Sequence, residues 1–250
     1  MPSGRCLWMS MSSLRKPWRN VSERCRTHMN DSADTVFVSR TMTPMSMEER
    51  KKRLLDELRR MGIEESILEA IAKTDREEFV PERYRRDAYA NYAQPIGHGQ
   101  TISQPYTVAY MIQLLDLQEG HSVLEIGAGS GYNAAVMSKL VGAKGRIVSV
   151  EIVSSLAETA KKNLRAAGID NVEVVQGDGY EGHPSGSPYD RIIVTAGASE
   201  IPDPLMEQLR KHGIMVIPVS VDGYQVMTRV LKDDPPRITR HGEFRFVPFR

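Results

Sequence analysis

Three glycines at alternate positions follow a short apolar run that contains an acidic residue. Gly127, Gly129 and Gly131 come directly after residues 123–126, and Glu125 is the acid within that run. Glycine allows positive φ angles and lets a ligand approach main-chain N–H groups without a Cβ atom in the way. The helix expected after the loop adds unpaired N–H donors and a partial positive charge. The pattern therefore predicts a loop that holds the polar end of a nucleotide-like cofactor.

The spacing of the glycines discriminates between cofactors. A dinucleotide fingerprint has glycines at relative positions one, three and six, whereas here they fall at one, three and five and Tyr132 takes the sixth position. Glu125 would repel a pyrophosphate but suits a ligand with an ammonium group. This Glu-x-Gly-x-Gly-x-Gly pattern resembles the first motif of the S-adenosylmethionine-dependent methyltransferases of the Rossmann-like class. A strand–turn–helix that binds no ligand is the alternative.

The next two strands expected along the chain, residues 146–151 and 172–176, also end beside acidic groups. A carboxylate at the position of Glu151 can accept hydrogen bonds from both ribose hydroxyls. Asp178, which lies between two glycines, is placed to meet the adenine amino group. The alternatives are that Glu151 caps the following helix and that Asp178 only forms a turn. Three consecutive strand ends of this kind predict a site for S-adenosylmethionine.

Strands and helices alternate from residue 122 onward, which predicts an α/β fold. We expect a doubly wound, mostly parallel sheet with N-terminal helices, the Rossmann-like class I methyltransferase architecture, with ligands at the carboxyl ends of the strands. Ser46 and Glu49 form a capping box, and Asp203 before Pro204 is expected to cap a late helix. The expected strands are residues 123–126, 146–151, 172–176, 190–195, 214–219, 225–231 and 244–247, and the expected helices include residues 64–73, 133–141 and 154–167.

The chain divides by composition into an N-terminal extension and a body. Residues 46–250 can bury a full core as a single methyltransferase domain. Residues 1–45 carry seven basic side chains against three acidic ones, with much Ser and Met and no apolar periodicity. We expect this extension to be disordered, or translation to begin at a later methionine. An Arg- and Ser-rich start with few acids also resembles an organelle transit peptide.

Composition also limits the possible partners. The chain of 250 residues has a formal net charge of +1, and the body without its extension is slightly acidic, which argues against a nucleic-acid binder. No apolar run is long enough to span a bilayer, so we expect no membrane partner. Both cysteines, Cys6 and Cys25, lie in the extension, and a reducing cytoplasm is the simplest compartment. The histidines show no metal-ligand spacing, and no metal is expected.

The loop before the glycine motif carries the most specific resemblance. Residues 95–105, Pro-Ile-Gly-His-Gly-Gln-Thr-Ile-Ser-Gln-Pro, are very similar to the signature of the protein-L-isoaspartate O-methyltransferases. Phe79-Val-Pro81, Gly177-Asp-Gly179, Ile192-Ile-Val-Thr195 and Arg245-Phe-Val-Pro248 match the same family in order. The resemblance covers residues 46–249. Some family members have a cofactor-binding Thr two residues after the last Val-Pro pair, where this chain has Arg250.

The resemblance implies an enzyme that methylates the free carboxylate of L-isoaspartyl residues, the first step in repairing damaged proteins and peptides. S-adenosyl-L-methionine would be the donor and S-adenosyl-L-homocysteine the product, and a monomer is expected. By resemblance, Ser103 is the active-site residue and Val247 holds the peptide by strand-like backbone pairing. The cofactor would be bound by Thr101, Ile102, Gln104, Glu125, Gly127, Gly129, Gly131, Glu151, Ile152, Asp178 and Gly179.

The residue types suit this chemistry. A carboxylic acid has a reference pKa of about 4, so the nucleophile is ionised at neutral pH and needs no general base. We therefore expect Ser103 to orient the acceptor carboxylate, with a helix N-cap before Pro105 as its alternative role. His98, between two glycines, is expected to buttress the loop. The alternative function is a class I methyltransferase that acts on another small molecule or on RNA.

Overall fold

The structure is a computed structural model that describes residues 45–249. Apart from Met45, the expected N-terminal extension lies outside the described residues, and so does Arg250. The division into extension and body therefore stays a prediction.

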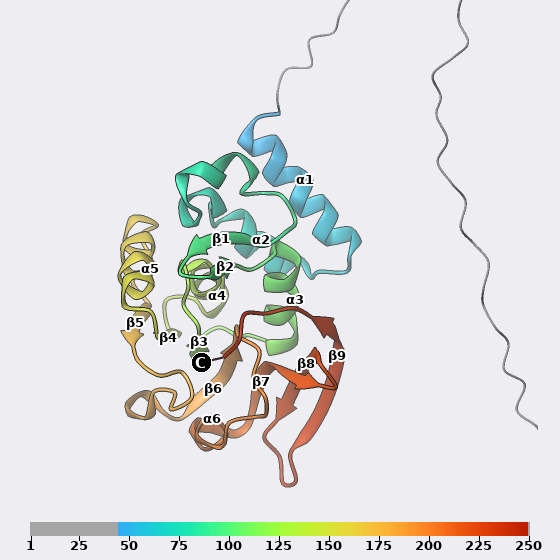
Figure 1. Cartoon of the computed structure of the whole chain (residues 1–250), viewed down its shortest axis with the longest axis vertical. Helices are drawn as coiled ribbons and strands as arrows, with labels where there is room; N and C mark the ends of the chain where they lie inside the picture. Colours follow the sequence, from blue (N-terminus) through green and yellow to red (C-terminus); the bar gives the residue numbers. More distant parts are fainter. Residues whose placement is uncertain (1–44, 250) are drawn as a thin grey trace, which may run out of the picture. The chain divides into compact units, whose positions relative to one another are not determined.

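A seven-stranded sheet with the order β5-β4-β3-β6-β7-β8-β9 forms the centre of the fold (Figure 1). Strands β3 to β7 run parallel, whereas β8 and β9 are antiparallel additions at one edge. The strands are β3 (Ser122–Ile126), β4 (Arg146–Glu151), β5 (Val172–Gln176), β6 (Tyr189–Val194), β7 (Leu209–Val221), β8 (Tyr224–Leu231) and β9 (Arg237–Phe244). The predicted fold class, a mostly parallel doubly wound sheet, is confirmed.

Helices cover the two faces of the sheet unequally. Alternate residues of one strand point to opposite faces, so Val123 packs with the large helical cluster and Leu124 with the smaller one around α6. The helices are α1 (Met47–Arg60), α2 (Glu65–Ala72), α3 (Pro105–Leu115), α4 (Tyr132–Val141), α5 (Ser154–Ala166) and α6 (Asp203–Gln208). Five of these, α1 to α5, contribute buried or partly buried residues to the large cluster. Strand β3 thus contributes to both core layers.

Short elements join the first helices to this core. Two 3₁₀ helices, η1 (Arg76–Phe79) and η2 (Glu82–Asp87), lead into the hairpin of β1 (Gln94–Gly97) and β2 (Gln100–Ile102). A third, η3 (Pro184–Gly186), precedes β6. Figure 1 shows the hairpin together with α1 and α2 at one end of the fold, near α3 and α4. The β1–β2 hairpin and the first two helices therefore lie close to α4, the helix that follows the glycine loop.

The topology opens a crevice beside β3. The chain runs from β3 outward to β4 and β5 and then returns to β6 on the other side of β3. Such a switch point separates the loops that follow two neighbouring strands, and α/β folds bind ligands there. The glycine loop follows β3, and Thr195 directly follows β6. The motif found in the sequence thus lies at the position where the fold is expected to bind a ligand.

Two local predictions were wrong. The last strand is Arg237–Phe244 and not residues 244–247, of which residues 245–247 follow the strand as an irregular segment. Strand β9 is an edge strand with a largely exposed, polar sequence, so it lacks the apolar alternation that would identify it. Asp203 is the first residue of α6 and not its cap, because Pro202 takes the N-cap position without a side-chain hydrogen bond.

The capping box at the start of α1 is confirmed and gives a test of local stability. The Glu49 N–H donates to Ser46 Oγ over 3.2 Å, and the Ser46 N–H donates to Glu49 Oε2 over 2.7 Å. Replacing Ser46 by Ala should cost about 1 kcal/mol of unfolding free energy. For a domain of this size the melting temperature should fall by about 2–4 °C. Ser66→Ala, on an exposed position of α2, is the control, and equal losses in both variants would contradict the capping role.

Candidate active site

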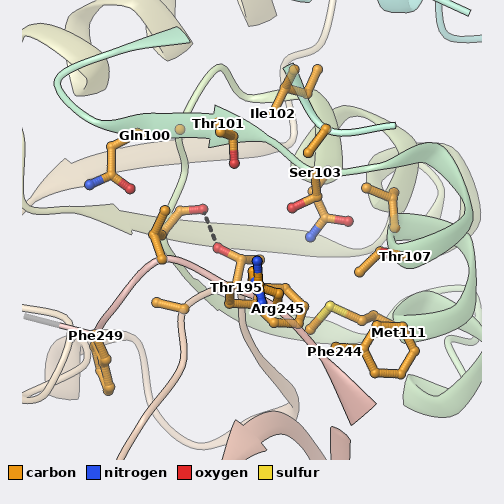
Figure 2. A pocket seen from close by; sticks show the side chains of 18 of the residues that line it. Gln100, Thr101, Ile102, Ser103, Thr107, Met111, Thr195, Phe244, Arg245 and Phe249 are labelled. Atoms are coloured by element: carbon orange, nitrogen blue, oxygen red, sulfur yellow. Dashed lines mark hydrogen bonds between the residues drawn. The ribbon is translucent and has the colours of Figure 1, made fainter. Parts of the chain in front are cut away.

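A cavity of about 1050 Å³ opens at the carboxyl ends of β3, β4 and β6. The glycine loop and the end of β4 form one part of its wall, and the segment from β2 to α3 forms another. The remaining wall comes from the tip of the β7–β8 hairpin and from residues 243–249. In Figure 2 the residues Thr101 and Ser103 lie on one side of the cavity, across from Thr195 and Arg245.

The first glycine is required by a close approach between two strand ends. A Cβ atom on Gly127 would lie 2.3 Å from Thr195 Oγ1, and its φ of +95° is unfavourable for other residues. The Thr195 hydroxyl is near two acceptors, the Ile126 carbonyl at 3.0 Å and the Gly127 carbonyl at 2.9 Å. The loop is therefore held against the end of β6 by one side chain.

The other two glycines differ in their surroundings. Gly129 lines the cavity, and its N–H donates to Glu151 Oε2 over 2.8 Å. Gly131 does not line the cavity. It is the N-cap of α4, and a Cβ atom there would lie 3.2 Å from Leu164 of α5. Gly131 thus permits close packing between two helices, a need that the sequence pattern does not distinguish from ligand contact.

Glu125 is completely buried and does not line the cavity. Its carboxylate accepts hydrogen bonds from Asn133 Nδ2 at 2.7 Å and from the Ser149 hydroxyl. Burial raises the pKa of Glu125 to about 7, against the lowering effect of these two hydrogen bonds, and the nearby charge of Glu151 adds to the rise. Asn133, which the sequence analysis did not identify, stands between this carboxylate and the cavity.

Glu151 joins the glycine loop to the beginning of α5. Its second carboxylate oxygen accepts from the Val153 N–H at 3.0 Å, and the residue is 5% exposed. The N-cap of α5 is Val153, and no side chain caps this helix. Glu151 and the exposed Ile152 both line the cavity, as the sequence predicts for the ribose end of a cofactor.

Asp178 and Gly179 are separated by the structure. Gly179 is buried at the cavity wall, where a Cβ atom would collide with Ile126 and Phe249. Asp178 is exposed and does not line the cavity, and its carboxylate accepts from the Tyr180 N–H at 2.9 Å. This contact is the turn that the sequence allowed as the alternative for Asp178.

The segment from Thr101 to Gln104 lines the cavity along its whole length. Ser103 is not a helix cap, because Gln104 takes the N-cap position of α3. Among residues 45–249, the Ser103 hydroxyl makes no hydrogen bond, whereas its carbonyl accepts from Arg76 Nη2 over 2.7 Å. His98 lies outside the lining and hydrogen-bonds to Ser155 of α5 at 2.8 Å, a contact that braces the hairpin.

Val247 belongs to a segment, residues 245–249, that closes the cavity opposite Ser103; Figure 2 labels Arg245 and Phe249 at its ends. The Gly197 N–H donates to the Val247 carbonyl over 2.8 Å, and the Phe249 N–H donates to the Gly197 carbonyl over 2.9 Å. The side chain of Gln225 binds both main-chain polar groups of Phe246. The segment is thus fixed by the backbone of Gly197 and by the side chain of Gln225 at the start of β8.

Thr195 and Gln225 are site residues that sequence reasoning assigned no role. Thr195 follows the fourth strand of the parallel order, and this position was a signal that could have identified it, because loops after parallel strands line such clefts. Gln225 had no comparable signal in the sequence, because its role is to bind the main chain of Phe246, and the sequence does not show that these two residues lie together.

Comparisons with known proteins agree with the geometry. The family model described as protein-L-isoaspartate(D-aspartate) O-methyltransferase (PCMT) matches residues 49–250. Protein-L-isoaspartate O-methyltransferase 2 of Archaeoglobus fulgidus is 47% identical over 209 residues, which cover 82% of this chain and 95% of that protein.

Two solved structures are similar over most of this chain. A protein-L-isoaspartate O-methyltransferase with 37% identity has a TM-score of 0.72, covering 79% of this chain and 65% of that longer one. A Plasmodium falciparum beta-aspartate methyltransferase (PCMT) in complex with S-adenosyl-L-homocysteine has 26% identity and a TM-score of 0.72, covering 80% of this chain and 98% of that one. The predicted family is confirmed: this chain belongs to the protein-L-isoaspartate(D-aspartate) O-methyltransferases.

Proposed function

We propose that this protein transfers a methyl group from S-adenosyl-L-methionine to the free carboxylate of L-isoaspartyl residues in damaged proteins and peptides. The products are the methyl ester, from which repair begins, and S-adenosyl-L-homocysteine. One observation carries the proposal beyond family membership. The acceptor segment 101–104 and the glycine loop line the same cavity, and the Ser103 hydroxyl is without a partner among the described residues.

The lining of the cavity fits the cofactor. Asn133 Oδ1 is a buried acceptor with no partner among residues 45–249, and Asn133 lines the cavity. An ammonium group is the donor that such an oxygen suits. When bound, S-adenosyl-L-methionine supplies an electrophilic methyl group on a sulfonium ion. Gly127 and Gly129 leave room for its amino-acid end at the backbone.

We assign Glu125 an indirect role in place of direct contact. Its carboxylate receives one N–H of Asn133, which orients the amide so that the opposite oxygen is directed away from Glu125. An ionised carboxylate behind the amide also provides the negative potential that favours an ammonium group. Glu125 and Asn133 would therefore hold the methionine end as a pair.

The nucleotide end is assigned to the loops after β4 and β5. Glu151 would accept the ribose hydroxyls, beside the exposed apolar side chain of Ile152. Gly179 gives a close approach for the adenine ring, and Asp178 adds an acidic group next to it in the chain.

At the acceptor end of the cavity, the substrate carboxylate must be correctly positioned, but it does not need acid–base catalysis. The carboxylate of an isoaspartyl residue is ionised at neutral pH, so no base has to remove a proton. Ser103 would donate its hydroxyl hydrogen to this carboxylate and direct one oxygen toward the donor. Thr101, Ile102 and Gln104 line the same wall, where they would lie over the cofactor, as the resemblance implies, and help to exclude water. Orientation of this kind can supply up to roughly 7–11 kcal/mol of the barrier.

The peptide backbone would lie along residues 245–249. The carbonyl of Val247 is already bound to Gly197, so we assign its N–H to the acceptor peptide. Arg245 is exposed at the cavity and supplies positive charge for an anionic acceptor.

We further propose that the protein is a cytoplasmic monomer that acts without nucleic acid or membrane. Separately, no helix in the described part of the chain has the length and apolarity to cross a bilayer.

A pair of matched peptides tests the acceptor. Radiolabelled S-adenosyl-L-methionine should give a base-labile methyl ester on a peptide that contains isoaspartate, and none on the same peptide with aspartate. The physical reason is that the extra backbone methylene of isoaspartate moves its free carboxylate relative to the main chain. Equal labelling of both peptides, or labelling of neither, would contradict the proposed function.

The ionisation of Glu125 should make cofactor binding depend on pH. With a pKa of about 7, the ionised fraction rises from about one tenth at pH 6 to about nine tenths at pH 8. We expect the affinity for S-adenosyl-L-homocysteine, measured by calorimetry, to increase up to about tenfold over this range, because the negative charge favours the ammonium group. No histidine among residues 45–249 lines the cavity to produce the same slope.

Glu125→Gln should remove this pH dependence. Glu243→Gln, which alters another carboxylate at the cavity wall, is the matched control and should retain it. An unchanged slope in Glu125→Gln would show that another group titrates.

A shortened chain tests the predicted domain division. A protein that lacks residues 1–45 should retain kcat/KM for the isoaspartyl peptide within about twofold, because every residue assigned here to the cavity lies after that position. A loss of tenfold or more, with unchanged melting temperature, would assign residues 1–45 a part in catalysis.

A further inference from the structure

Arg76 is fully buried in η1 and is not part of the cavity wall. Its Nη2 donates to the Ser103 carbonyl over 2.7 Å, and its Nε donates to the Ala88 carbonyl over 2.9 Å. The guanidinium carbon lies 4.7 Å from the centre of the Tyr132 ring. Tyr132 begins α4 directly after the glycine loop. The buried Arg76 therefore contacts both the acceptor segment, residues 101–104, and the start of α4, the helix that follows the glycine loop.

The environment of Arg76 is costly for a charge. None of the ion pairs between described residues includes Arg76. Both Arg76 Nη1 and the Tyr132 hydroxyl are buried without a hydrogen-bond partner in residues 45–249. Burial lowers the pKa of the guanidinium, although arginine keeps its proton in proteins. An apolar side chain would fill this space at a smaller desolvation cost. Arginine contributes what an apolar residue lacks, a planar fork that fixes two carbonyl groups.

Ser103 is one of the two residues whose carbonyl groups the Arg76 guanidinium binds. The preceding residue, Ile102, is held by pairing with Gln94, and the following residue, Gln104, is held by its hydrogen bond to the Asn91 carbonyl. Ser103 lies between these two anchored neighbours, and its bond to Arg76 is its sole hydrogen bond to any residue the structure describes. Arg76 is therefore the one side chain among the described residues that holds the main chain of Ser103 itself.

We propose that Arg76 is a positioning residue for methyl transfer: its buried fork fixes Ser103 relative to the glycine loop, so that the hydroxyl meets the acceptor carboxylate. This inference rests on the proposed role of Ser103. It predicts a loss in kcat with little change in cofactor affinity, because the glycine loop has its own contacts to Thr195 and Glu151.

Arg191 provides a matched control. It is 9% exposed, and its Nε and Nη2 donate to the Leu115 and Asp116 carbonyls at 2.7 and 2.9 Å. Like Arg76, Arg191 donates to two main-chain carbonyls. It also has an ion pair with Asp116 at 3.7 Å, and it acts at the far end of α3, outside the cavity lining.

The test is a double-mutant cycle on kcat for the isoaspartyl peptide, using Arg76→Met, Ser103→Ala and the double variant. Arg76→Met alone should lower kcat at least tenfold, whereas the dissociation constant for S-adenosyl-L-homocysteine should change less than threefold. In the Ser103→Ala background, the same change should lower kcat less than twofold, because the group it positions is gone. Arg191→Met should reduce the melting temperature and leave kcat within twofold.

Three results would overturn the proposal: independent losses that multiply in the double variant, a parallel loss of cofactor affinity, or an equal loss of kcat in Arg191→Met. Arg76→Lys keeps the charge but not the fork and should give an intermediate kcat, so it replaces Arg76→Met in the cycle if that variant does not fold. Failure of both variants to fold would assign Arg76 to stability alone. Labelling of the isoaspartyl peptide by the unmodified protein reports the proposed function separately.

Discussion

The contact between Thr195 and the end of β3 is the constraint on which the site depends. The Thr195 hydroxyl sits at hydrogen-bonding distance from two successive carbonyls, and the space it occupies is the space of a Cβ atom on Gly127. The chain can therefore leave β3 only through a glycine with positive φ. That turn brings the N–H of Gly129 to Glu151 and starts α4 beside the cavity. A packing requirement between two parallel strands thus creates the backbone surface that a cofactor can approach.

Two carboxylates near this turn have different surroundings. Glu151 lines the cavity and accepts two backbone N–H groups. Glu125 is buried, and its folded pKa of about 7 exceeds the ordinary value of 4.5. Between these pH values the folded state binds more protons than the unfolded state, so the unfolding free energy falls as the pH rises, by on the order of 3 kcal/mol in all. The fold tolerates this loss at neutral pH, as expected where a buried charge serves a ligand.

Sequence reasoning succeeded where the relevant forces are local. An apolar run that ends in an acid and a glycine reveals a strand end, and β4 and β5 have the predicted bounds. It could not separate the tasks of Gly127, Gly129 and Gly131, because ligand approach, strand contact and helix packing all favour glycine. Nor could it place the carboxylate of Glu125, since Asn133 reaches that carboxylate only because α4 packs against the sheet. Strand β9 was missed because its solvent-facing edge carries no apolar pattern.

The acceptor side of the cavity shows why substrate preference is harder to derive than cofactor binding. Its walls come from residues 101–104 and 245–249, which are distant in sequence and meet only because β7, β8 and β9 return the chain to the sheet. An anionic nucleophile requires neither a base nor a metal motif, so the residue types leave no chemical signature. What the reaction does require is fixed geometry, and the groups that supply it are carbonyl and amide anchors. Gln225 and Gly197 fix one wall through the backbone, as Arg76 fixes the other. The specificity of such a site therefore resides in how main-chain segments are held.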